Sequence, residues 1–152
     1  MILMPDQVWT DEQFDEMSWH DNCVHGLRVV EGTRGAGELI LDLDYILEWI
    51  ETEKGFRFRI QPVTLKFREV TDLRILLDYA TPTIALGPFS IHAIERKFEQ
   101  RERYTAQVWK LLINSPIGEI TFESQGFEQR GVGTPRLSSG QWLSPEERED
   151  RT

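Results

Sequence analysis

Hydrophobic and polar residues alternate with a period of two along most of the chain. The longest alternating run extends from Glu38 to Trp49, where Leu39, Leu41 and Leu43 share one face. A period of two predicts β-strands that bury one face. The pattern covers residues 24–30, 38–49, 56–61, 63–68, 73–79, 89–98, 104–114 and 119–124, which predicts about eight strands.

The connections between these segments are mostly short and rich in turn residues. Gly55 follows a polar run at residues 51–54, and the segment 31–37 contains three glycines. Short connections favour antiparallel neighbours, because parallel strands need long crossovers. We therefore predict an all-β fold, either an antiparallel sandwich or a partly open barrel. Pro62 is expected to bend or end a strand. Residues 73–79 also fit a helical spacing, but their short length and flanking strands favour a strand.

Both ends of the chain depart from this pattern. Thr10 and Gln13 have the spacing of a helix capping box, which predicts a short helix that ends near Ser18. The chain divides into a β domain at residues 1–130 and a tail at residues 131–152 that is either mobile or docked by Trp142 and Leu143. Residues 144–147 (Ser-Pro-Glu-Glu) predict one helical turn in this tail.

The chain length of 152 residues is typical of one domain that buries roughly 70% of its unfolded surface. Such a domain needs neither a metal nor a disulfide to form a core. The alternating pattern predicts that a set of large apolar side chains is mostly buried. This set comprises Leu39, Leu41, Leu43, Phe56, Phe58, Ile60, Leu65 and Phe67.

The net charge of −9 and the single cysteine limit the partners and the compartment. An acidic chain repels a phosphate backbone, and the densest basic segment, residues 96–103, contains two Glu of its own, so nucleic acid is not expected. Cys23 has no intrachain partner, and we expect it to be a buried apolar residue.

The start of the chain lacks the basic and apolar regions of a signal peptide, and no apolar run has the length of a membrane span. We expect a cytoplasmic protein.

Two segments carry a resemblance to a known group of proteins. Residues 19–21 form a Trp-His-Asp element, and residues 41–45 form a Leu-Asp-Leu-Asp-Tyr strand. Together with residues 70–73 and 118–120, these segments resemble small bacterial proteins of an uncharacterised family. The resemblance covers roughly residues 14–128. It implies a bacterial source and implies no activity or catalytic residue.

The first candidate binding cluster contains Trp19, His20, Asp21 and His25. Histidine is the commonest metal ligand, and the cluster contains several versatile ligand types. However, His20 and His25 lie five residues apart, which places them on opposite faces of a regular strand. No zinc-type spacing is present, so we predict no metal. The alternative is that His20 and Asp21 form the turn between the helix and the first strand.

Asp42 and Asp44 form the second candidate. Aspartate is depleted in strands, and two at this spacing share one face with Cα atoms about 7 Å apart. Such a pair could act as general acid and base or bind a hard cation. The simpler interpretation is a solvated face of the sheet, shared with other carboxylates. Ile40 and Ile46 lie on the same face, which a fully solvated surface does not require.

No further motif predicts catalysis or a cofactor. Gly32, Gly35 and Gly37 lack the Lys and Ser/Thr of a phosphate-binding loop. We therefore expect a non-catalytic bacterial protein that binds another protein, such as an immunity-type protein that neutralises a basic target. The alternative is a small hydrolase or a ligand- or metal-binding barrel in which the His and Asp side chains converge. An exposed strand edge could also form a homodimer.

Overall fold

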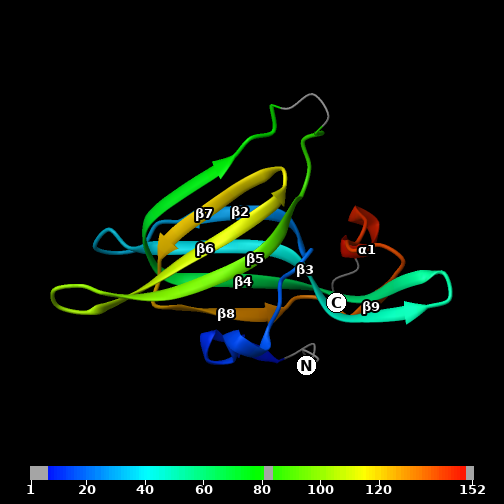
Figure 1. The fold of residues 1–152 in the computed structure, drawn as a ribbon, viewed down its shortest axis with the longest axis horizontal. Coiled ribbons are helices and arrows are strands. Elements are labelled where there is room, and N and C mark those ends of the chain that lie inside the picture. The colour runs from blue at the N-terminus through cyan, green and yellow to red at the C-terminus, as the bar shows by residue number, and fades with distance from the viewer. Residues whose placement is uncertain (1–6, 81–83, 150–152) are drawn as a thin grey trace.

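The computed structural model describes residues 7–80 and 84–149, and antiparallel strands dominate them (Figure 1). Strand is by far the largest class, which confirms the all-β prediction. In chain order the elements are β1 (Val8–Thr10), the 3-10 helix η1 (Asp11–Glu16), β2 (Cys23–Val30), β3 (Gly37–Thr52), β4 (Gly55–Leu77), β5 (Phe89–Gln100), β6 (Thr105–Ser115), β7 (Ile117–Glu123), β8 (Gly126–Gly131), β9 (Arg136–Ser138) and the helix α1 (Pro145–Glu149).

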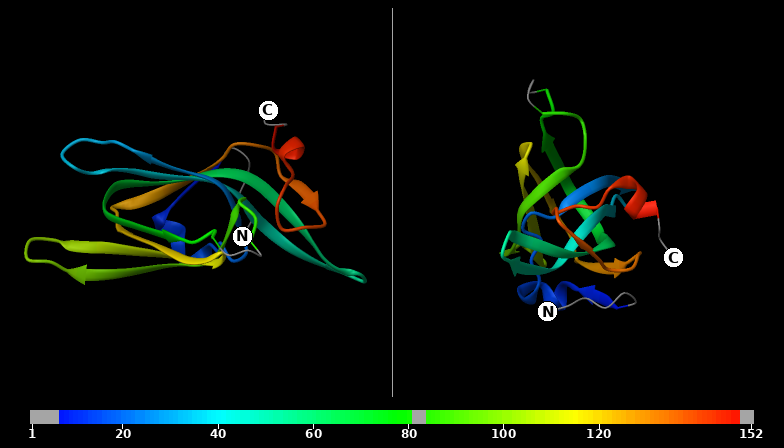
Figure 2. Two further views of the ribbon diagram at one scale, coloured as in Figure 1. Left: turned by 90° about the horizontal axis from the view of Figure 1, so that it is seen from above. Right: turned by 90° about the vertical axis from the view of Figure 1, so that its right-hand side faces the viewer.

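The strands form one sheet that curls into a partly closed ring. Strand β4 pairs with β3 on one side and with β7 and β8 on the other, and the order continues from β7 through β6, β5 and β2 back to β3. The ring is visible in the end-on view of Figure 2. It closes between β2 and β5 through only two residue pairs, Cys23 with Ser90 and Val24 with Phe89. The curl gives the sheet an interior that side chains can fill.

Strand β4 is longer than the alternating pattern indicated. Its 23 residues include three segments predicted as separate strands, and it does not end at Pro62. The carbonyl of Pro62 accepts a hydrogen bond from the amide of Val132 at 2.9 Å, so the missing N–H of the proline faces the end of β8. The ladder between β4 and β8 begins at Val63, and therefore the proline interrupts no central hydrogen bond.

Two residues with positive φ bend β4 without ending it. Glu69 has φ 53° and Asp72 has φ 54°, and the register against β7 shifts between Thr71 and Arg74. Irregularities of this kind increase the bend and twist of a strand. They allow β4 to pair first with β8 and then with β7.

A core of aromatic and aliphatic side chains fills the ring. Phe67 packs against Trp109, Phe122 and Phe127 with ring centroids 4.7–5.6 Å apart. The predicted burial is confirmed for Leu39, Leu41, Leu43, Phe58, Ile60, Leu65 and Phe67. Phe58 and Ile60 belong to a second, smaller cluster with Ile46 and Leu143.

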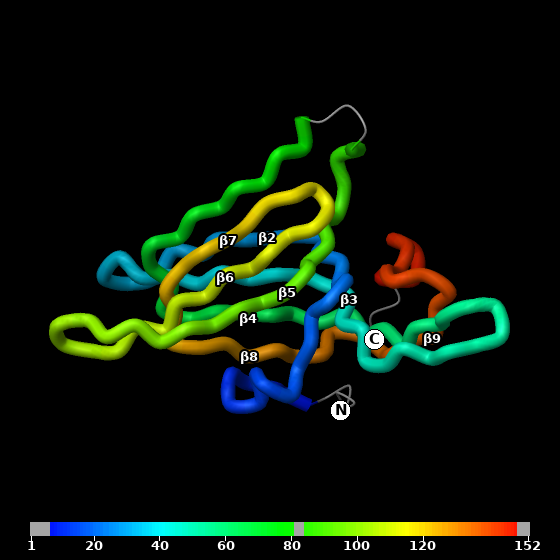
Figure 3. The backbone as a smooth tube through the Cα atoms, viewed as in Figure 1, coloured from blue at the N-terminus to red at the C-terminus, as the bar shows by residue number. Residues whose placement is uncertain are grey.

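The predicted burial of Phe56 is wrong. This side chain is 50% exposed, and it pairs with Glu51 close to the turn of the β3–β4 hairpin. Figure 3 shows that this hairpin extends beyond the ring, on the side opposite to the β2–β3 and β5–β6 hairpins. The strand pattern continues into the extension, but no interior lies beneath it.

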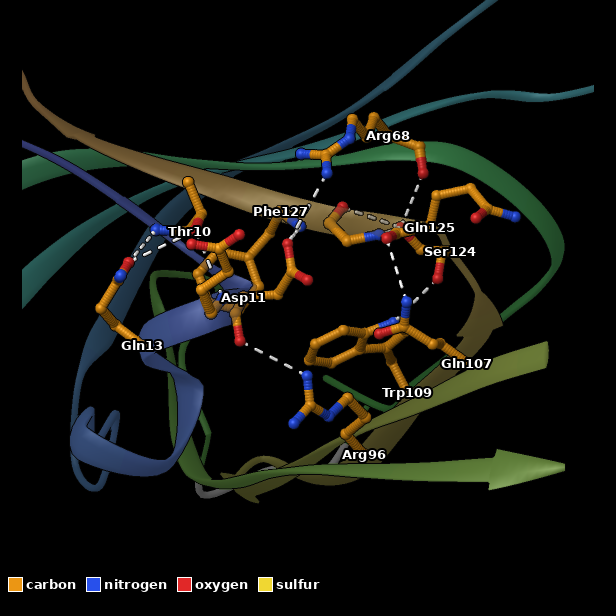
Figure 4. Close-up of polar contacts among 12 residues, drawn as sticks. Thr10, Asp11, Gln13, Arg68, Arg96, Gln107, Trp109, Ser124, Gln125 and Phe127 are labelled. Carbon is orange, nitrogen blue, oxygen red and sulfur yellow. Dashed lines mark hydrogen bonds and ion pairs between the residues drawn. The ribbon is translucent and has the colours of Figure 1, made fainter. Parts of the chain in front are cut away.

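The N-terminal helix η1 is held against the ring by polar contacts (Figure 4). The predicted capping box is confirmed, since Gln13 Oε1 accepts a hydrogen bond from the Thr10 amide at 2.9 Å. Asp11 Oδ1 accepts one from the Phe127 amide at 3.2 Å and lies 3.7 Å from Arg68. The helix ends at Glu16, slightly earlier than predicted.

Candidate functional site

The predicted cluster at residues 19–25 separates into three environments. Trp19 is a core residue whose indole N–H donates to Gln129 Oε1 at 2.8 Å. His20 lies in the turn before β2, where its Nδ1 is 3.0 Å from the carbonyl oxygen of His92. His25 lies within β2, beside a register shift in the pairing with β3. The two histidines therefore do not share a site.

Asp21 occupies the turn next to His20 and has a φ of 63°. Aspartate adopts this left-handed conformation more readily than most residues. Its carboxylate accepts hydrogen bonds from the Asn114 side chain at 3.3 Å and from the Gln141 side chain at 3.0 Å. Asp21 thus connects the end of β6 with the C-terminal segment.

Asp44 is fully buried, and donors from three elements surround its carboxylate. Oδ2 lies 2.8 Å from His25 Nε2 and accepts a hydrogen bond from the Leu143 amide, also at 2.8 Å. Oδ1 accepts a hydrogen bond from the guanidinium of Arg148. A buried carboxylate requires such partners, because burial without them costs several kcal/mol. The interpretation of this face as solvated is therefore wrong for Asp44.

Arg148 joins the two predicted aspartates. Its guanidinium also donates to Asp42, whose side chain is 38% exposed. The arginine itself is 6% exposed. The binding-pocket hypothesis requires His20, His25, Asp42 and Asp44 to converge, and only the last three do so. The group that the two aspartates share is the guanidinium of Arg148, a side chain of the same protein.

The C-terminal segment that carries Arg148 is docked on the outer face of the sheet. Leu143 has no exposed surface and packs in the cluster of Ile46, Phe58 and Ile60, whereas Trp142 is 58% exposed. The predicted terminal helix is confirmed as α1.

A reciprocal pair of hydrogen bonds caps α1. Ser144 Oγ accepts a hydrogen bond from the Glu147 amide at 3.2 Å, and Glu147 Oε1 accepts one from the Ser144 amide at 3.0 Å. Hydrogen bonding of the Ser144 backbone amide, and then of its side chain, to the Glu147 carboxyl lowers the pKa of that carboxyl. The cap fixes the start of the helix and thereby the direction in which Arg148 projects.

The buried ion pairs among these residues hold the C-terminal segment and close Asp44 off from solvent. An acid–base carboxylate needs an open approach to a substrate, and Asp44 has none.

In residues 7–80 and 84–149, no group of three His, Cys, Asp or Glu side chains could hold a metal ion. Within the same ranges, no helix combines the length and apolar character needed to cross a membrane.

Sequence reasoning missed the role of Arg148, although one signal pointed to it. Ile40 and Ile46 lie on the face of Asp42 and Asp44, and apolar residues there indicate a covered surface. Neither the covering segment nor its arginine could be identified from this signal, since Asp44 and Arg148 are 104 residues apart.

Cys23 begins β2 and is buried next to the same region. Burial raises the pKa of its thiol to about 11 from a usual value of 9.0. Since only the thiolate reacts, the native protein at pH 8 should react with a disulfide reagent at least ~100-fold more slowly than the urea-unfolded chain. Equal rates for the native and unfolded protein, followed by absorbance, would show that Cys23 is exposed or ionised.

The comparisons with known proteins assign no family to this arrangement. No protein-family model matches the chain, and no curated protein matches it.

Proposed function

We propose that this is a non-catalytic bacterial protein that acts in the cytoplasm by binding another protein. The observation that carries the proposal is the position of its exposed tryptophans. Trp49 is 43% exposed and Trp142 is 58% exposed, whereas the other three are buried. Trp49 lies in β3 near the hairpin turn, and Trp142 lies between β9 and α1. Figure 1 shows the β3–β4 hairpin, β9 and α1 at the same end of the molecule.

Several aromatic side chains at this end contact one another. The Trp49 ring lies 5.0 Å from Phe58, 5.8 Å from Phe56 and 6.4 Å from His20, which it stacks upon at an interplanar angle of 19°. Phe58 is buried beneath, and Phe56 is half-exposed. We call Trp49, Phe56 and His20 the aromatic patch. Exposed tryptophans held in place by their neighbours are typical anchors of protein interfaces, because they bury a large area at low entropic cost.

The charge of the chain favours a basic partner. A net charge of −9 steers association with a positively charged protein and weakens association with an acidic one. An immunity-type protein that covers a basic target fits this charge and a size of 152 residues. The alternative of a hydrolase or a ligand-binding barrel loses support, because Arg148 and the Leu143 amide already donate hydrogen bonds to the Asp44 carboxylate that a ligand would need.

Removal of the aromatic patch should abolish partner binding without unfolding the protein. The immobilised parent and the Trp49→Ala/Phe56→Ala variant would be incubated with cytosol of the source cell at low salt. We expect a basic protein to be retained by the parent, eluted at high salt and lost in the variant. The partner would then be purified, and its affinity measured by calorimetry, where a loss of at least ~10-fold is expected for an interface anchor.

A matched control is available on another hairpin. Phe98 and Tyr104 are 61% and 50% exposed at the β5–β6 end, so Phe98→Ala/Tyr104→Ala removes a similar exposed aromatic area. This variant should retain the partner. If the same proteins were retained by the parent and both variants, the aromatic patch would not be the binding surface.

A further inference from the structure

A pocket with a volume of about 530 Å³ lies beside the aromatic patch. Four chain segments that are distant in sequence form it: the turn into β2, the start of β5, the end of β6 and the segment before α1. Its walls include Asp21, Cys23, Ser90, Asn114, Gln141 and Trp142. This volume is within the range of roughly 300–1,000 Å³ typical of binding pockets. His20 belongs to the patch and its neighbour Asp21 to the pocket, so the two features adjoin.

The carboxylate of Asp21 is held in a fixed orientation. Asn114 Nδ2 donates to Oδ1, and Gln141 Nε2 donates to Oδ2. Each carboxylate oxygen can accept a second hydrogen bond, so these two contacts leave acceptor capacity on both oxygens. A carboxylate oriented by amides from two different segments is pre-organised for a ligand with two parallel donors.

The pocket carries one unbalanced negative charge. Asp21 is the only acidic or basic residue of its wall apart from Cys23, whose thiol is neutral because burial raises its pKa to about 11. Within the described residues no Lys or Arg pairs with Asp21, and His20 Nε2 lies 3.5 Å from its Oδ2. Trp142 adds an indole to the wall, and the face of an indole ring attracts cations. A carboxylate and an indole face together select a cation.

We infer that this pocket receives the guanidinium of an arginine from the protein partner, an inference that rests on the proposed function. The guanidinium is planar, so it can stack on Trp142 while its parallel N–H groups donate to the two oxygens of Asp21. A lysine ammonium lacks this fork and the flat stacking surface. Arginine and tryptophan are both enriched among the hot spots of protein interfaces.

A short peptide provides a direct test on the full-length protein. The probe is acetyl-Gly-Arg-Gly-amide, and the matched peptide contains citrulline, which has the same shape without the charge. Binding would be followed by NMR through the side-chain amide signals of Asn114 and Gln141, which contact Asp21. We expect saturable shifts with the arginine peptide, at least ~10-fold weaker binding of the lysine peptide and no shifts with citrulline.

Variants distinguish binding in the pocket from nonspecific attraction between the peptide and the acidic protein. Asn tolerates a positive φ as Asp does, so Asp21→Asn should keep the backbone of the turn and weaken binding of the arginine peptide at least ~10-fold. Trp142→Ala should weaken the binding by a similar factor. Glu53→Gln removes the same charge from the exposed turn of the β3–β4 hairpin and should have no effect. Equal binding of the arginine and citrulline peptides, absence of shifts in the parent, or unchanged binding in Asp21→Asn would overturn the inference.

The outcomes also distinguish this inference from the proposed function. A partner that is captured by the parent and by Asp21→Asn, but lost in Trp49→Ala/Phe56→Ala, would support protein binding and overturn the arginine pocket. Peptide binding without any captured partner would support the chemistry of the pocket and overturn the proposed function.

Discussion

Replacement of Arg148 by Met is expected to lower the free energy of unfolding by about 3–5 kcal/mol. Arg148 is buried and pairs with both Asp44 and Asp42. The methionine keeps the apolar part of the side chain but removes the guanidinium from Asp44, which keeps His25 and the Leu143 amide as partners. A buried carboxylate without its cationic partner is costly, and the variant can lower this cost either by protonating Asp44 or by undocking the C-terminal segment.

Two measurements distinguish these responses. Urea unfolding gives the change in stability, and chymotrypsin digestion reports cleavage near Trp142 and Leu143 when the segment undocks. The control is Arg59→Met, which breaks the exposed pair with Glu48 at 3.4 Å on neighbouring strands. Exposed pairs contribute about 0–1 kcal/mol, so this variant should remain close to the parent. A loss below ~1 kcal/mol for Arg148→Met, with no increase in cleavage, would contradict the role of Arg148.

The fold class followed from the alternating pattern because most strands bury only one face. Leu39, Leu41 and Leu43 point into the ring, and the residues that alternate with them, Ile40 and Asp42, lie on the opposite face. The continuity of β4 did not follow from the pattern. Glu69 and Asp72 bend the strand by adopting positive φ, and such a change in backbone conformation has no periodic signature.

The exposure of individual aromatic residues was harder to predict, because one part of β4 buries one face of the strand and another part buries the opposite face. Phe58 and Ile60 face the cluster covered by Leu143, whereas Val63 and Phe67 face the interior of the ring. The apolar positions change from even to odd numbers between Ile60 and Val63, and this phase change indicates two separate apolar environments.

The candidate site could also be predicted only in part from the sequence. Sequence spacing placed Asp42 and Asp44 correctly on one face of β3, as their common contact with Arg148 requires. The donor to these carboxylates comes from α1, which contacts the sheet only through tertiary packing. Local patterns contain no information on such long-range pairs. His20 and His25 do lie apart, but the reason is that His20 belongs to the turn before β2, and not that the two histidines alternate along one strand.

The second large effect is expected in the aromatic core. Phe67→Ala should lower the free energy of unfolding by about 3–5 kcal/mol, since it removes buried apolar area and leaves a cavity among close-packed rings. Phe67 has no exposed surface, and its ring contacts Trp109, Phe122 and Phe127. These neighbours are themselves fixed by strands β6, β7 and β8, so they cannot easily collapse into the space.

Phe56→Ala is the matched comparison, because it changes the same residue type in the same strand. Phe56 is 50% exposed on the β3–β4 hairpin, and its main ring contact is Trp49 at 5.8 Å. Loss of one exposed aromatic contact should cost no more than about 1 kcal/mol. Urea unfolding of the two variants should therefore differ by at least ~2 kcal/mol. Equal losses would mean that the hairpin is part of the cooperative core, and an aromatic patch available to a partner would then be excluded.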